Sequence, residues 1–171
     1  ATNVGASGTL YWGIMIPSAS LLPNAGYNLT KVALYTYYSG TTTLNIYLGG
    51  HNAPAGAPIV TQSFDMLGNN SFMEIDLNNM IPIDATQNLW ITFYNQGVSY
   101  TATACANTGD ANGRWISTNG TSWNDLANYG LNYTWMMRAF VEDTGNAICW
   151  SNRIGKPFVL NEGWNWISSY I

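Results

Sequence analysis

The chain has little charge. Asp, Glu, Lys and Arg make up only 8% of its 171 residues, against roughly 25% in an ordinary soluble domain. With five basic and nine acidic residues the net charge is −4, so the basic surface that binds nucleic acid is missing. No apolar run approaches the roughly 18 residues of a membrane-spanning helix. The 47% hydrophobic content still supports a sizeable core, and the length predicts one main domain.

Residues of catalytic chemistry are equally scarce. His51 is the only histidine, and no GxSxG or HExxH motif supports pairing it with Cys105 as a base and nucleophile. One histidine and two cysteines cannot build a convincing zinc site. Glu74 and Asp76 share a predicted strand face with side chains about 7 Å apart, within the roughly 6.5–9.5 Å of inverting glycosidases. Any two carboxylates so spaced on a strand meet that test, so we expect a solvated strand face and no enzyme.

Strand-like patterning is abundant instead. Apolar and polar residues alternate with a period of two over 29–38, 42–48, 71–77, 88–94 and 133–141, and more weakly over 10–16 and 58–64. Gly, Asn and Pro separate these runs, and Ser39-Gly40 predicts a hairpin between the first two. No stretch of 12 or more residues has helical periodicity. The sequence therefore predicts an all-β fold, an antiparallel β-sandwich of jelly-roll or immunoglobulin-like type, and we expect the jelly roll.

Two regions break the alternation. The segment 100–129 is long, polar and rich in aromatics, with one short strand-like piece at 114–117, and loops of this length are usually functional. The tail alternates again in two short runs after a turn-rich stretch. We expect residues 1–143 to form a β-sandwich binding module. Residues 144–171 are either extra C-terminal strands or the truncated start of a following domain, the interpretation we favour.

The aromatic content suggests what the module binds. Eight Trp and 11 Tyr exceed the needs of a core this size. A sugar ring stacks its C–H face on a flat aromatic, while Asn, Asp, Arg and backbone groups bind its hydroxyls, and such a neutral ligand requires few charges. The segment 100–129 brings both kinds of residue together, and we predict a carbohydrate site there made of Tyr100, Arg114, Trp115, Trp123, Asn124, Asp125 and Tyr129.

Other interpretations of the aromatics remain open. Trp115 is the better candidate for an exposed platform, whereas Trp123 also fits a structural tryptophan beneath the loop. Tyr35, Tyr37 and Tyr47 are expected on one sheet face across the predicted hairpin, where they would either line a binding surface or pack as a cross-strand ladder. Aromatic residues with polar groups also build protein interfaces.

A calcium site and a disulfide are two structural features that the sequence allows. Asp110, Asp125, Glu142 and Asp143 offer the oxygen ligands that calcium prefers, although turn-forming roles explain the same residues. The calcium ligands we single out are Asp110, Glu142 and Asp143. Cys105 and Cys149 are either one disulfide, as in an oxidising compartment, or two buried thiols.

Several segments in order resemble a known kind of module. They are YWGIMIP from Tyr11, LTKVALY from Leu29, LNIYLGG from Leu44, IPIDATQNLWITFY from Ile81, ISTNGTSWNDL from Ile116, WMMRAFVE from Trp135 and GWNWISSY from Gly163. Over about residues 10–142 the chain resembles the jelly-roll cleaved-adhesin domains, and the neighbouring carbohydrate-binding β-sandwiches, of large secreted or surface proteins of gut and oral anaerobes. The resemblance rests most on NGTSWNDL and NLWITFY. It implies a non-enzymatic binding or adhesion role, often with structural calcium, and a GWNWIS-like phrase that opens the next module.

These observations predict a non-catalytic carbohydrate-binding module of a larger glycan-degrading or adhesin protein. We expect an extracellular or bacterial cell-surface location, a monomer, and a neutral polysaccharide such as one from plant cell walls as the partner, alongside other modules of the same polypeptide. The alternatives are a protein-binding adhesin or structural spacer and, more remotely, a small glycosidase or lyase.

Overall fold

The structure is a computed structural model that describes residues 2–5, 8–96, 102–106 and 110–143. Its β-strands are β1 (Thr2–Val4), β2 (Thr9–Ile16), β3 (Asn28–Thr36), β4 (Ser39–Leu48), β5 (Val60–Leu67), β6 (Ser71–Pro82), β7 (Leu89–Gln96), β8 (Ala102–Ala106), β9 (Trp115–Ser117), β10 (Asn124–Asp125), β11 (Tyr133–Trp135) and β12 (Met137–Glu142). The short helices are α1 (Ser18–Leu21) and the 3₁₀ turns η1 (Leu22–Asn24), η2 (Ala111–Gly113) and η3 (Leu126–Tyr129). The predicted tail, 144–171, lies outside the described residues.

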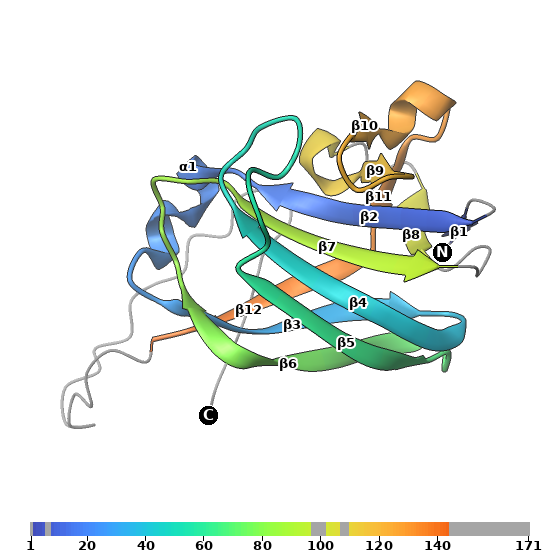
Figure 1. Ribbon diagram of the computed structural model, residues 1–171. Helices are drawn as coiled ribbons and strands as arrows, with labels where there is room; N and C mark the ends of the chain where they lie inside the picture. Colours follow the sequence, from blue (N-terminus) through green and yellow to red (C-terminus); the bar gives the residue numbers. More distant parts are fainter. Residues whose placement is uncertain (1, 6–7, 97–101, 107–109, 144–171) are drawn as a thin grey trace.

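The strands form antiparallel sheets in two layers (Figure 1). One layer is a six-stranded sheet in the order β10-β9-β2-β7-β4-β5. The other holds the three-stranded sheets β1-β8-β11 and β12-β3-β6. These two sheets meet at Met136, whose N–H donates to the carbonyl of Thr103 at 3.0 Å and whose carbonyl accepts from the N–H of Tyr35 at 3.0 Å. The all-β sandwich expected from the sequence is confirmed, while its jelly-roll connectivity stays a prediction.

The core lies between the layers, where the inward residues of both meet. From the six-stranded sheet it includes Leu10, Trp12, Leu44, Ile46, Leu89, Ile91 and Phe93, all at most 1% exposed. From the opposite layer it includes Leu29, Val32, Leu34, Ile75, Ala104, Trp135 and Met137. Because successive side chains of a strand point to opposite faces, this inward set leaves the odd-numbered residues of β2, β4 and β5 pointing outward.

The predicted hairpin at Ser39-Gly40 is wrong. β3 and β4 do not pair, because β3 lies between β12 and β6 and β4 lies between β7 and β5 in the other layer. The turn carries the chain from one layer to the other, so that the two amphipathic strands bury their apolar faces against each other instead of pairing edge to edge. Tyr35 and Tyr47 therefore lie on different sheets, and the shared face predicted for Tyr35, Tyr37 and Tyr47 is not formed.

The strand predicted over 133–141 is divided by the irregular residue Met136 into β11 and β12, which pair with different neighbours. β1, β8 and β10 had no alternating signal long enough to be predicted.

Within the part of the chain that the structure describes, no helix has the length and apolar character needed to cross a membrane.

One side chain joins the edges of the two layers. β5 and β6 are edge strands, and the amide of Gln62 on β5 donates to the carbonyl of Asp76 at 2.9 Å and accepts from the N–H of Asn78 at 3.0 Å. The Gln62 amide thus satisfies both backbone groups as a neighbouring strand would.

We expect Gln62→Leu to lower the free energy of unfolding by about 1 kcal/mol, since a typical hydrogen bond contributes about that much and the freed backbone groups are exposed to water. Urea unfolding at constant m measures it. Gln87→Leu is the matched control, because Gln87 bonds only Asp84 within its own turn. An equal loss in both variants would contradict the bridging role of Gln62.

Candidate functional site

The outward face of the six-stranded sheet carries a second apolar cluster, separate from the core. Its centre is Trp90 on β7, which is completely buried although it points away from the core. Met15 and Trp123 are also buried there, at 3% and 9% exposed. Partly exposed residues pack around these three, namely Tyr11, Tyr47, Ala53 and Trp115.

Strand pairing gathers these residues. Tyr11 of β2 lies opposite Tyr94 of β7, and Trp90 lies between Met15 and Tyr47. The rings of Tyr11 and Tyr94 stack with centroids 4.6 Å apart. Because outward residues of neighbouring strands lie side by side, three segments far apart in sequence form one aromatic surface.

Trp115 and Trp123, the two predicted platform residues of the long segment, both join this cluster. Their ring centroids lie 5.3 Å and 5.8 Å from that of Trp90. β9 pairs with β2 and β10 pairs with β9, so the segment extends the sheet instead of standing apart as a loop. Trp115 is partly exposed. Trp123 is almost fully covered, in agreement with its structural interpretation.

The turn before Trp123 belongs to the NGTSWNDL segment and lies against Tyr11. Ser117 and Asn119 accept hydrogen bonds from backbone N–H groups of the turn, and the indole N–H of Trp123 donates to the Gly120 carbonyl at 3.1 Å. Gly120 has φ of +76°, and a Cβ there would lie 2.9 Å from the Tyr11 ring. Only glycine allows this close approach.

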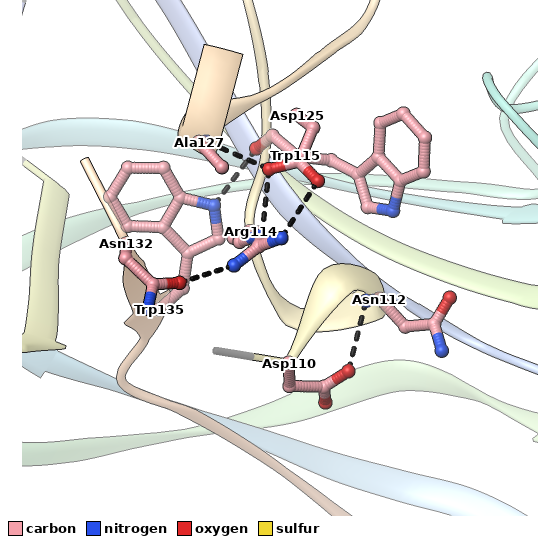
Figure 2. A network of polar contacts seen from close by, with 8 residues as sticks. All are labelled: Asp110, Asn112, Arg114, Trp115, Asp125, Ala127, Asn132 and Trp135. Carbon is pink, nitrogen blue, oxygen red and sulfur yellow. Dashed lines mark hydrogen bonds and ion pairs between the residues drawn. The ribbon is translucent and has the colours of Figure 1, made fainter. Parts of the chain in front are cut away.

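Arg114 and Asp125, predicted as sugar contacts, bind each other (Figure 2). The Arg114 Nε lies 2.6 Å from Asp125 Oδ1, its Nη2 donates to Oδ2 at 3.1 Å, and its Nη1 donates to Asn132. Asp125 Oδ1 also accepts from the N–H of Ala127 at 2.8 Å. Their side chains are only 13% and 26% exposed. This network supports the β9–β10 unit that carries Trp115.

The other predicted sugar contacts are Tyr129, Asn124 and Tyr100. Tyr129 on η3 is 61% exposed, and Asn124 on β10 is exposed. Tyr100 lies outside the described residues. Asp110 caps η2 by accepting from the N–H of Asn112 at 2.9 Å (Figure 2). A contact of Tyr129, Asn124 or Tyr100 with sugar stays a prediction.

The predicted calcium ligands are not gathered into one site. Among the described residues no three His, Cys, Asp or Glu side chains are placed to hold a metal ion. Asp110 caps a 3₁₀ turn, while Glu142 ends β12. Calcium binding through Asp110, Glu142 and Asp143 therefore stays a prediction.

The remaining chemistry-bearing residues are spread over the molecule. His51 is in the exposed connection after β4, and Cys105 is on β8 in the opposite layer. Cys149 lies outside the described residues, so its pairing with Cys105 stays open. Glu74 and Asp76 lie 2.7 Å and 3.5 Å from the Lys31 ammonium on an exposed strand face.

Beside the aromatic cluster runs a row of polar pairs along β4 and β5, which we call the β4–β5 ladder. Its outward side chains are joined across the two strands: Thr41 donates to Asp65 at 2.7 Å, Thr43 and Ser63 share a hydrogen bond of 3.1 Å, and Thr61 donates to Asn45 at 2.8 Å. Thr43 lies opposite Tyr94, so the ladder borders the tyrosines directly. Asp65 is the only charged member.

The hydroxyls of Tyr11 and Tyr47 lie in a partly desolvated environment. Burial raises the pKa of Tyr11, and its neighbour Tyr94 adds to the effect. Burial also raises the pKa of Tyr47, helped by Tyr11, while a hydrogen bond with Thr92 acts in the opposite direction. These tyrosines therefore remain neutral donors and acceptors at physiological pH.

Sequence reasoning did not identify Tyr11, Tyr94 or the β4–β5 ladder as a site. The alternation of Thr41, Thr43 and Asn45 with apolar residues was visible, but their partners on β5 and β7 depend on the strand order. No family model, curated protein or solved structure with which the chain was compared matches it.

We expect Asp125→Asn to lower the free energy of unfolding by about 1–2 kcal/mol, because it removes the charge that pairs with the largely buried side chain of Arg114. Asp110→Asn is the matched control, since Asp110 makes the same kind of cap without a basic partner and asparagine caps as well. Thermal or urea unfolding compares the two. Equal stability of both variants would show that the ion pair contributes nothing.

Tyr11 and Tyr47 should be among the last tyrosines to ionise in an alkaline titration followed by tyrosinate absorbance. A raised folded-state pKa means that their stabilising contribution is present below about pH 10, the ordinary tyrosine pKa, and is lost as the pH rises through the folded pKa. Tyr47→Phe should remove a late step and reduce the alkaline loss of stability. Loss of an early step instead would contradict the buried environment of its hydroxyl.

Proposed function

We propose that this chain is a non-catalytic carbohydrate-binding module that binds neutral polysaccharide on the outward face of its six-stranded sheet. The observation that supports this function is the border between partly exposed tyrosines and the β4–β5 ladder. Tyr47 and Tyr94 offer aromatic surface to the C–H groups of a sugar. Thr43, Ser63 and Thr61 offer hydroxyls for its hydroxyl groups.

The distribution of charge favours an uncharged ligand on this face. The outward face of the opposite layer carries Lys31, Glu74, Asp76 and Arg138, with the Arg138 guanidinium 3.8 Å from the centre of the Phe72 ring. The β4–β5 ladder carries Asp65 alone. A neutral glycan loses less solvation energy than a charged one on meeting such a surface.

This proposal changes the roles expected for residues of the segment 100–129. Trp115 contributes aromatic surface at the edge of the proposed site. The ion pair between Arg114 and Asp125 stabilises the β9–β10 unit that carries Trp115 and does not contact sugar. An isolated module of this kind binds with dissociation constants on the order of micromolar to millimolar, or about −8 to −4 kcal/mol. Fusion to other binding modules in a larger polypeptide would raise the apparent affinity through avidity.

The test is affinity electrophoresis against a panel of soluble neutral plant polysaccharides. We expect the parent chain to be retarded by at least one of them, and Tyr94→Ala to weaken the interaction about tenfold, a loss of about 1.4 kcal/mol. Ser63→Lys is a second variant that obstructs the ladder from an exposed position without touching the aromatic cluster. It should abolish retardation while the fold, followed by circular dichroism, is unchanged.

Tyr129→Ala is the matched control, because Tyr129 is an exposed ring on η3 and not on the ladder. Loss of binding in Tyr129→Ala alone would move the site to the long segment and contradict the sheet-face proposal. No retardation by any polysaccharide would remove carbohydrate binding and favour a protein-binding adhesin or spacer.

A further inference from the structure

The β4–β5 ladder is much longer than one sugar ring. Its three pairs, from Thr41 to Asn45, span four steps of about 3.4 Å, or about 14 Å, and the outward residues of β4 from Tyr47 to Ser39 span eight steps, or about 27 Å. All three hydrogen-bonded pairs lie within this length. A ligand that covered this whole row would therefore be a chain of several sugars, aligned with the strands.

Exposed apolar side chains mark the end of the ladder away from Tyr47. Leu67, opposite Ser39 in the register, points outward and is 63% exposed. Tyr37 and Tyr38, in the turn just before β4, are 46% and 40% exposed, and their rings meet edge to face at 4.9 Å. No charged residue occurs in the two turns of this end or in the strand residues next to them, 36–41 and 66–71.

This end is held rigidly by contacts between its two turns. Asn70 donates its N–H to the Thr36 carbonyl at 2.9 Å, and the Tyr35 hydroxyl donates to the Asn70 carbonyl at 2.7 Å. Gly68 has φ of +63°, and a Cβ there would lie 2.5 Å from the backbone nitrogen of Ser39. Aromatic groups on a preorganised support bind with less loss of conformational entropy, so the two exposed tyrosines are suited to stacking.

We propose that the polysaccharide lies along the β4–β5 ladder and that Tyr37 and Tyr38 form a second aromatic contact at its far end. The module then recognises an internal stretch of a long chain rather than a chain end or a short oligosaccharide. This inference rests on the proposed function and specifies its ligand. A pocket of about 190 Å³ beside the end of β2, lined by Pro17, Asp110 and Trp135 among others, lies away from the ladder and takes no part.

The experiment uses a polysaccharide that retards the parent chain and a length series of its oligosaccharides, with affinities measured by calorimetry. For the parent chain we expect the affinity to rise with length until the ladder is covered. The double variant Tyr37→Ala and Tyr38→Ala should bind the longest chains about tenfold more weakly and the shortest binding oligosaccharides unchanged. Tyr94→Ala should weaken both. Reduction of the chain ends with borohydride should change nothing.

Three results would overturn the inference while leaving the proposed function intact. They are full affinity for the shortest oligosaccharide, a double variant that matches the parent on the polymer, and loss of binding on end reduction. A parent chain that binds no glycan would overturn both proposals together. Because Tyr37 and Tyr38 are exposed, unchanged thermal unfolding of the double variant separates lost contact from lost fold.

Discussion

The burial of Trp90 on the outward side of the central strand β7 shapes most of this molecule. β7 has neighbours on both edges and a core beneath it, so an indole on its other face would be left in water unless something covered it. Trp115, Trp123 and Tyr47 cover the ring, and its N–H donates to the Gly50 carbonyl at 3.3 Å. The long segment after β8 therefore folds back as β9 and β10 and extends the sheet.

That covering divides the outward face into two halves. The half over β2, β7 and β9 is aromatic, and the half over β4 and β5 is a ladder of hydroxyl, amide and carboxylate groups. The two halves meet at Tyr94 and Thr43. Lys31 and Arg138 lie instead on the opposite layer, where they are paired with carboxylates or rings, and Arg114 beside the six-stranded sheet is paired with Asp125. This separation supports the proposal of a neutral ligand on one face.

The predicted strands succeed where alternation is strong and fail where contacts between distant segments decide. β4, β6 and β7 lie where the period of two indicated, because each has an apolar face that only a core can cover. β8 and β10 are short and had been assigned to a loop, since their pairing depends on β1, β11 and β9. Of the candidate site, Trp115 and Tyr47 were singled out in advance. Tyr11 and Tyr94 were not, because nothing local distinguishes an outward tyrosine in a binding surface from one that packs.

The sequence by itself determined the class of fold, the residues that face inward and the low charge content of the surface, because backbone alternation and composition are local properties. The tertiary structure decided which strands are neighbours. It placed Tyr35 and Tyr47 on different layers, brought Trp115 beside Trp90, and aligned Thr43 with Ser63 and Tyr94. Strand order is set by the packing of distant apolar faces against one another, and no local pattern of residues carries that information.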